Sequence, residues 1–151
     1  MTEIGFYHLK SLTLERALPQ LLEKAYAGGY RVVLMAGSAE RIDHLNTLLW
    51  TYGDAAFLPH GSVKDGNAAQ QPIWLTIEDE NPNNADMLVL VDGATSHHLD
   101  RYKRVLDVFD GNDEAAVASA RERWRQAKAA GHALTYWQQT DKGWEKAGGA
   151  G

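Results

Sequence analysis

Three short apolar runs constrain the fold of this chain more than any other feature of its sequence. They cover residues 30–36, 87–91 and 104–109; glycine flanks the first on both sides, aspartate flanks the second on both sides, and aspartate follows the third. Continuous apolar runs of this length are typical of strands that are buried on both faces of a parallel sheet. The sequence therefore predicts a sheet that is covered by other structure on both sides.

The segments around these runs have apolar residues at the 3.6-residue spacing of amphipathic helices. This pattern is found over residues 13–28, 38–53 and 113–130, and weaker strand patterns cover residues 4–9, 73–76 and 132–138. Strands that alternate with helices predict an α/β fold with a mostly parallel sheet flanked by helices.

The length of 151 residues suits one domain, which we assign to residues 1–146. The remaining five residues, 147–151, have the sequence Ala-Gly-Gly-Ala-Gly and are expected to form a flexible tail. The chain shows no repeat and no internal linker, so we expect no second domain.

Composition excludes several classes of protein. The absence of cysteine excludes a disulfide framework, a cysteine-based zinc site and a thiol nucleophile. No apolar run approaches the roughly 20 residues that cross a bilayer, and the acidic start is unlike a signal peptide, so we expect a soluble cytoplasmic protein with no membrane partner. The net charge of −5 argues against tight direct binding to DNA.

The sequence offers little support for catalysis. It contains neither of the glycine-rich phosphate-binding motifs, G-x-x-x-x-G-K-[ST] or G-x-G-x-x-G. The six histidines do not show the i, i+4 spacing of a helical metal site, and His60, within Pro59-His60-Gly61, suits a structural turn. Asp92 follows a predicted strand, where α/β enzymes place catalytic carboxylates, but no nucleophile and base accompany it. We therefore predict that the protein is not an enzyme and has no metal or cofactor.

The helix predicted over residues 113–130 carries the one arrangement of side chains in the sequence that points to a binding site. At about 100° per residue, Arg121, Arg125 and Lys128 form one stripe, and Trp124 lies at its flank. Guanidinium groups bind carboxylates with two parallel hydrogen bonds, and an indole offers a surface for another ring. This chemistry suits a peptide that has acidic residues and ends in an aromatic residue with a free carboxylate. Arg123 could attract further acids of such a peptide.

Two alternatives stay open for this helix. Its basic face could simply be solvated, because basic helix faces are common and cations near a helix C-terminus interact favourably with the helix dipole. The helix over residues 121–128 could also bind single-stranded nucleic acid directly.

A second aromatic group consists of Trp50, Tyr52 and Phe57. Packing in the core is the simpler explanation for these residues. The functional alternative is an exposed hydrophobic anchor for a protein partner.

Four segments of the chain resemble, in a consistent order over residues 3–139, the chi subunit of bacterial DNA polymerase III. The most specific segment contains Ala-Arg-Glu-Arg-Trp-Arg at 120–125 and Gly-His-Ala-Leu-Thr-Tyr-Trp-Gln-Gln at 131–139. The others are Phe-Tyr-His-Leu at 6–9, Phe-Leu-Pro-His-Gly at 57–61 and Val-Phe-Asp-Gly at 108–111.

This resemblance implies a Rossmann-like fold without a nucleotide-binding loop and a non-catalytic accessory subunit of the clamp-loader complex. It also implies binding to the acidic C-terminal tail of single-stranded-DNA-binding protein, which ends in phenylalanine, and so a link between the replicase and coated single-stranded DNA. The positions that match the family's tail site are Arg121, Trp124, Arg125 and Lys128. A second partner, either the psi subunit or an accessory helicase, is implied at Trp50 and Phe57. Where some relatives have a lysine one turn before Arg121, this chain has Val117.

Overall fold

The fold is built on one sheet of eight strands. The computed structural model describes residues 2–52, 58–141 and 143–150. The strands lie in the order β3-β4-β2-β5-β6-β1-β7-β8, and every neighbouring pair is parallel except β7 and β8, which are antiparallel. This confirms the predicted α/β class with a mostly parallel sheet. The strands are β1 (Glu3–Leu9), β2 (Val32–Met35), β3 (Gly61–Ser62), β4 (Ile73–Thr76), β5 (Met87–Val91), β6 (Arg104–Asp110), β7 (Ala133–Thr140) and β8 (Gly143–Ala150).

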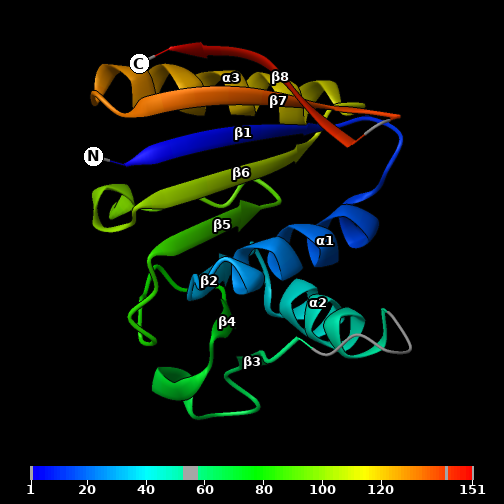
Figure 1. Ribbon diagram of the computed structural model, residues 1–151, viewed down its shortest axis with the longest axis vertical. Helices are drawn as coiled ribbons and strands as arrows, with labels where there is room; N and C mark the ends of the chain where they lie inside the picture. Colours follow the sequence, from blue (N-terminus) through cyan, green and yellow to red (C-terminus); the bar gives the residue numbers. More distant parts are fainter. Residues whose placement is uncertain (1, 53–57, 142, 151) are drawn as a thin grey trace.

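Within the described residues, three α-helices cover the two faces of the sheet (Figure 1). They are α1 (Leu14–Ala27), α2 (Ala39–Thr51) and α3 (Glu114–Ala129). Helices α1 and α2 contribute to a core on one face, whereas α3 packs in a second core on the opposite face. Two single 3₁₀ turns, Ala68–Gln70 and Leu99–Arg101, lie in the connections. In the described ranges, each helix is too short or too polar to cross a membrane.

The apolar runs form the centre of the sheet, as the sequence predicts. Every residue of β2 and β5 is buried, and their alternate side chains feed the two cores on opposite faces. Helix α3 begins within one residue of its predicted start, and its cap is Asp113, whose carboxylate accepts hydrogen bonds from the backbone N–H groups of Ala115 and Ala116. Helix α1 continues through Pro19, which is itself buried.

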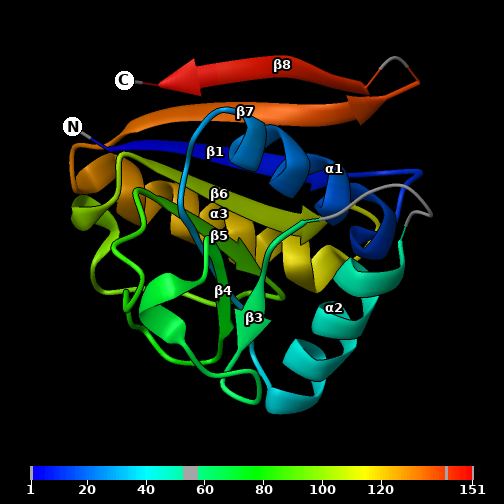
Figure 2. The same ribbon diagram turned by 60° about the horizontal axis from the view of Figure 1, so that its bottom comes forward.

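Strand β8 is the main departure from the sequence-based expectations. Its residues 147–150 belong to the segment expected to form a flexible tail, but the structure pairs them with the edge strand β7 (Figure 2). An unpaired edge exposes a row of backbone donors and acceptors, which a neighbouring strand of almost any sequence can bond. Trp144 anchors β8 further, because its ring packs edge-on against Tyr7 at 5.1 Å. The assignment of residues 1–146 as the domain remains a prediction.

Candidate functional site

Helix α3 and the β7–β8 edge of the sheet enclose a groove. Helix α3 packs over β6, β1 and β7, and β8 lies beyond it at the edge of the sheet. The groove has a volume of about 540 Å³, within the range of cavities that take small ligands. Its lining residues come from five elements and are Phe6, Phe109, Val117, Ala120, Arg121, Trp124, Arg125, Tyr136, Gln138 and Ala147.

Four aromatic side chains line this groove. Trp124 is half-buried and packs edge-on against Phe6 at 5.2 Å and against Tyr136 at 6.1 Å between ring centroids. Phe109 lies 6.3 Å from Tyr136 and is buried. Edge-to-face contacts of this kind fix the rings relative to one another. These contacts hold the Trp124 indole in place at the side of the cavity.

His8 supports the aromatic wall from behind. Its ring packs against Phe109 at 5.2 Å, and its Nδ1 atom is hydrogen-bonded to the hydroxyl of Tyr136. Burial, followed by the nearby charges of Lys10 and Arg121, lowers the pKa of His8, although Asp110 opposes the shift. His8 is therefore neutral at pH 7. Burial also raises the pKa of Tyr136 against the influence of Arg121, so the phenol stays protonated.

The cations of the predicted stripe differ in their partners. Arg121 is exposed and, in the part of the chain that the structure describes, makes no hydrogen bond or ion pair. Arg125 lies 3.3 Å from Glu122, in a pair whose side chains are 71% and 55% exposed, and exposed pairs of this kind are worth little. Lys128 is exposed in the last turn of α3 and does not line the groove. The groove therefore faces one arginine that has no partner among the described residues and a second that is weakly held.

Arg123 corrects the expectation that it would attract acids of a partner. Its Nε and Nη2 atoms donate to the two carboxylate oxygens of Asp107 at 2.6 and 3.0 Å, and Nη1 donates to Ser119. The side chains of Arg123 and Asp107 are only 11% and 4% exposed. Arg123 lies on the opposite side of α3 from Arg121, and its ion pair with Asp107 stabilises the packing of α3 on β6.

The other predicted surface lies on α2. Trp50 is 52% exposed, and its ring centroid is 4.4 Å from that of His60. His60 itself is buried, with its ring nitrogens 2.6 Å from the Leu58 carbonyl and 3.2 Å from the Asn46 carbonyl, which supports its interpretation as a structural turn residue. Phe57 lies outside the described residues.

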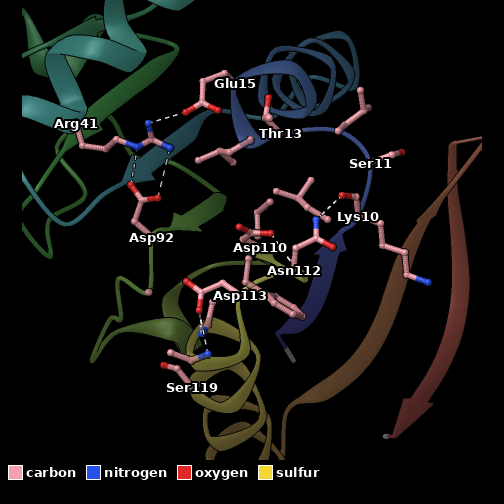
Figure 3. A pocket seen from close by; sticks show the side chains of 18 of the residues that line it. Lys10, Ser11, Thr13, Glu15, Arg41, Asp92, Asp110, Asn112, Asp113 and Ser119 are labelled. Carbon is pink, nitrogen blue, oxygen red and sulfur yellow. Dashed lines mark hydrogen bonds and ion pairs between the residues drawn. The ribbon is translucent and has the colours of Figure 1, made fainter.

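A second and larger cavity opens at the carboxyl ends of β1, β5 and β6 (Figure 3). Its volume is about 720 Å³. Helices α1 and α3 leave the adjacent strands β1 and β6 toward opposite faces, so this crevice lies where α/β proteins commonly bind ligands. Its charged lining residues are Lys10, Glu15, Arg41, Asp92, Asp110, Asp113 and Arg123.

The charges of this crevice are largely used within the chain. Arg41 of α2 donates to Glu15 at 2.7 Å and to Asp92 at 2.7 Å, as Figure 3 shows. Asp92, a sequence candidate for catalysis, has a φ of 55° and is held by Arg41 at the end of β5. Across the described ranges, no group of three or more acidic or histidine side chains is placed to hold a metal ion. The crevice is a network of internal ion pairs with surplus carboxylates, which suits an anionic ligand poorly.

Sequence reasoning found the helical side of the groove and missed the strand side. Phe6, Phe109, Tyr136 and Gln138 lie on three strands that are distant in the sequence, so no local pattern joins them. The signal that could have identified Tyr136 is strand alternation, because Leu134, Tyr136 and Gln138 share one face of β7. Ala147 could not have been found, since its segment was expected to be flexible.

Comparison with known proteins identifies the family of this chain. The model of the family described as DNA polymerase III chi subunit, HolC, matches residues 1–135. The chain belongs to this family. The probable DNA polymerase III subunit chi of Rickettsia prowazekii (strain Madrid E) is 34% identical over 109 residues, which are 72% of this chain and 66% of that protein. The DNA polymerase III subunit chi of Pseudomonas aeruginosa (strain PAO1) is 25% identical over 137 residues, which are 89% of this chain and 94% of that protein.

The chain spans just under two thirds of the length of the Rickettsia relative. Membership confirms the resemblance drawn from the sequence motifs, and it assigns the chain to the family of DNA polymerase III chi subunits. The residues that match the family model include all of α3 and thus the whole helical side of the groove.

Proposed function

We propose that this protein is a non-catalytic accessory subunit that captures the acidic C-terminal tail of single-stranded-DNA-binding protein. In this role it links the polymerase III clamp-loader complex to coated single-stranded DNA. The observation that carries the proposal is the groove beside α3, where Arg121 has no internal partner among the described residues and faces an aromatic cavity.

The chemistry of the groove matches the chemistry of such a tail. The terminal carboxylate pairs with Arg121 and Arg125, since guanidinium–carboxylate bonds are charge-assisted and roughly twice as strong as neutral ones. The terminal phenyl ring enters the cavity walled by Trp124, Phe109 and Tyr136. Acidic residues that precede the terminus lie toward Lys128, at the exposed end of α3. An affinity on the order of micromolar, about −8 kcal/mol, suits a contact that must release.

A titration of a synthetic tail peptide tests this proposal. Isothermal calorimetry with a peptide that has several aspartates and a terminal phenylalanine should give micromolar affinity for the parent protein. Arg121→Ala should lower that affinity at least tenfold, because a charge-assisted bond worth about 1.5–3 kcal/mol is removed. Arg16→Ala removes another exposed arginine, on α1, and should leave the affinity within twofold.

Two altered peptides separate the parts of the mechanism. Amidation of the C-terminus removes the carboxylate, and replacement of the terminal phenylalanine by alanine removes the ring. Each change should weaken binding at least tenfold. Parent protein that binds the amidated peptide as well as the free acid would contradict capture of a chain terminus.

The rival function is direct binding of single-stranded nucleic acid by the 121–128 segment, which its three exposed cations favour. Trp124 argues against it, because its ring is half-buried and packs against both Phe6 and Tyr136, so the indole is not an open stacking platform. The rival predicts tight binding of bare oligonucleotides, with log affinity falling linearly and steeply with log salt. The tail proposal predicts weak oligonucleotide binding.

The clamp-loader side of the link is proposed to lie at Trp50 and Phe57, through a psi subunit or an accessory helicase. Trp50 is a large exposed apolar residue on α2, which contacts β3 and β4 at the far end of the sheet from β8. Helix α2 and helix α3 also cover opposite faces. Both partners can therefore bind together. Trp50→Ala should abolish retention on the clamp-loader complex in a pulldown and leave tail-peptide affinity unchanged.

A further inference from the structure

The groove crosses the boundary of the family match. Seven of its ten lining residues precede residue 135, where the match ends, whereas Tyr136, Gln138 and Ala147 follow it. Ala147 belongs to β8, which lies wholly beyond the matched residues. The side of the groove opposite α3 is therefore built partly by a segment that the family model does not describe.

Strand β8 is positioned by contacts on the other face of the sheet. It pairs with β7 from Thr140 onward, and Trp144 packs with Tyr7 beside the core on the α1 side. Alternation along the strand turns Glu145, which pairs with Gln138, toward the α3 side. Ala147 is an extra residue opposite the step from Tyr136 to Trp137, where the register of the pair shifts. Bulges of this kind re-aim a side chain, and here the small side chain lines the groove.

The charges of the groove define its occupant. Arg121 and Arg125 supply positive charge along the α3 side, and the rest of the lining is aromatic, aliphatic or neutral polar. A ligand that has an anionic group next to an aromatic ring matches both the two arginines and the uncharged part of the lining. An extended peptide that ends in an aromatic residue with a free carboxylate supplies the two groups next to each other, so it is the occupant to which the groove corresponds.

We propose that strand β8 is the outer wall of this peptide-binding groove and that Ala147 sets how an acidic, aromatic-ended tail fits in it. This inference rests on the proposed function. The tail lies between α3 and the β7–β8 edge, with its terminal carboxylate on the arginine side and its backbone alongside Ala147. A charged side chain at position 147 therefore faces the bound tail across the groove.

Two substitutions that place opposite charges at position 147 test whether β8 forms the outer wall of the groove. Ala147→Glu should weaken binding of the aspartate-rich peptide ending in phenylalanine about tenfold, because the new carboxylate repels the tail and competes for Arg121. Ala147→Lys should strengthen it a few-fold. Loss of fold cannot move the affinity in both directions. The same two substitutions at Val63, which is 80% exposed near the β3 end of the sheet, are the matched control and should stay within twofold.

A proximity measurement gives an independent readout. Because the chain has no cysteine, Ala147→Cys and Val63→Cys each introduce a single thiol. A tail peptide that carries a bromoacetyl group near its C-terminus should alkylate the Ala147→Cys protein at least tenfold faster than the Val63→Cys protein. Mass spectrometry follows the reaction, and excess unlabelled peptide should suppress the difference.

The outcomes separate this inference from the function on which it rests. Arg121→Ala that weakens binding while both Ala147 charge variants bind like the parent overturns the wall and leaves tail capture intact. Equal alkylation at the two thiols overturns the wall in the same way. A parent protein that does not bind the peptide overturns both proposals.

Discussion

The crevice at the carboxyl ends of β1, β5 and β6 and the groove beside α3 both contain arginines, but they use them in opposite ways. In the crevice, Arg41 is bonded to Glu15 and Asp92, and Arg123 is bonded to Asp107. In the groove, Arg121 has no ion pair with any described residue. The arginines of the larger cavity are thus paired with carboxylates of the same chain. The smaller cavity has an arginine that can pair with a carboxylate of a partner. Availability of charge, more than volume, distinguishes a binding site from a structural network.

Helix α3 contains this contrast within two residues. Arg121 and Arg123 are about 200° apart around the helix axis, so one points to the groove and the other into the sheet. The identity of the residue does not decide between these roles. What decides is whether the sheet presents an acid to that side of the helix, as β6 presents Asp107 to Arg123.

The largest expected effect comes from the structural arginine. Arg123→Ala should lower the free energy of unfolding by about 3–5 kcal/mol, because it leaves the Asp107 carboxylate buried without its partner. Burial already raises the pKa of Asp107, and Arg123 opposes that shift. Urea denaturation of the two proteins measures the difference. Arg121→Ala is the matched control on the same helix and should change stability by less than about 0.5 kcal/mol. Equal losses would erase the distinction between the two arginines.

The next largest effect is expected from a substitution at the junction between the groove and the larger crevice. A Cβ at Gly111 would lie 1.9 Å from the ring of His8 and 2.4 Å from the Leu9 carbonyl. Gly111→Ala should therefore cost about 1–3 kcal/mol of stability and displace His8, which holds Tyr136 in the groove. Thermal unfolding and peptide titration should both respond. Gly37→Ala, whose Cβ would meet only the Asp92 carbonyl at 4.0 Å, should leave both measurements nearly unchanged.

The sequence predicted the elements whose pattern is local. The apolar runs at 87–91 and 104–109 became buried strands, and α3 covers nearly all of the predicted range 113–130. Strand β8 was missed because Ala-Gly-Gly-Ala-Gly has low strand propensity, and its conformation depends on the open edge of β7. The sequence of residues 147–150 alone does not indicate that they pair with β7.

The candidate site divides in the same way. Helical periodicity placed Arg121, Arg125 and Trp124 beside one another, and all three line the groove. The separate expectation that Arg123 would attract acids of a partner was wrong, because its partner Asp107 lies on β6, sixteen residues earlier. Pairing between an element and a distant strand requires knowledge of the sheet order. Sequence periodicity gives the face of a helix but not what covers it.

A smaller effect tests the internal character of the crevice. Burial alone would raise the pKa of Glu15, but its hydrogen bond to Arg41, with the charges of Arg41 and His44, outweighs burial and lowers it. A lowered folded-state pKa contributes stability above the unfolded pKa of about 4.3 that is lost as the pH falls through the folded value. Arg41→Met should therefore cost about 1 kcal/mol at pH 7, limited by partial exposure of the pair. In urea denaturation across pH 7 to 3, that cost should shrink toward zero at the acid end; a cost independent of pH would mean that Arg41 acts through packing alone.

The smallest effect concerns the limit of the groove along α3. Lys128 is exposed and does not line the cavity, so it acts on a bound tail only through solvent. Lys128→Ala should weaken tail-peptide binding about twofold in 50 mM salt, and the difference should disappear near 300 mM, where the screening length falls below about 6 Å. Arg121→Ala should keep most of its effect at both salt concentrations, because direct contacts are screened less. A tenfold loss for Lys128→Ala that persists at high salt would extend the contact surface one turn beyond the groove and place Lys128 with Arg121 instead of with the solvated cations.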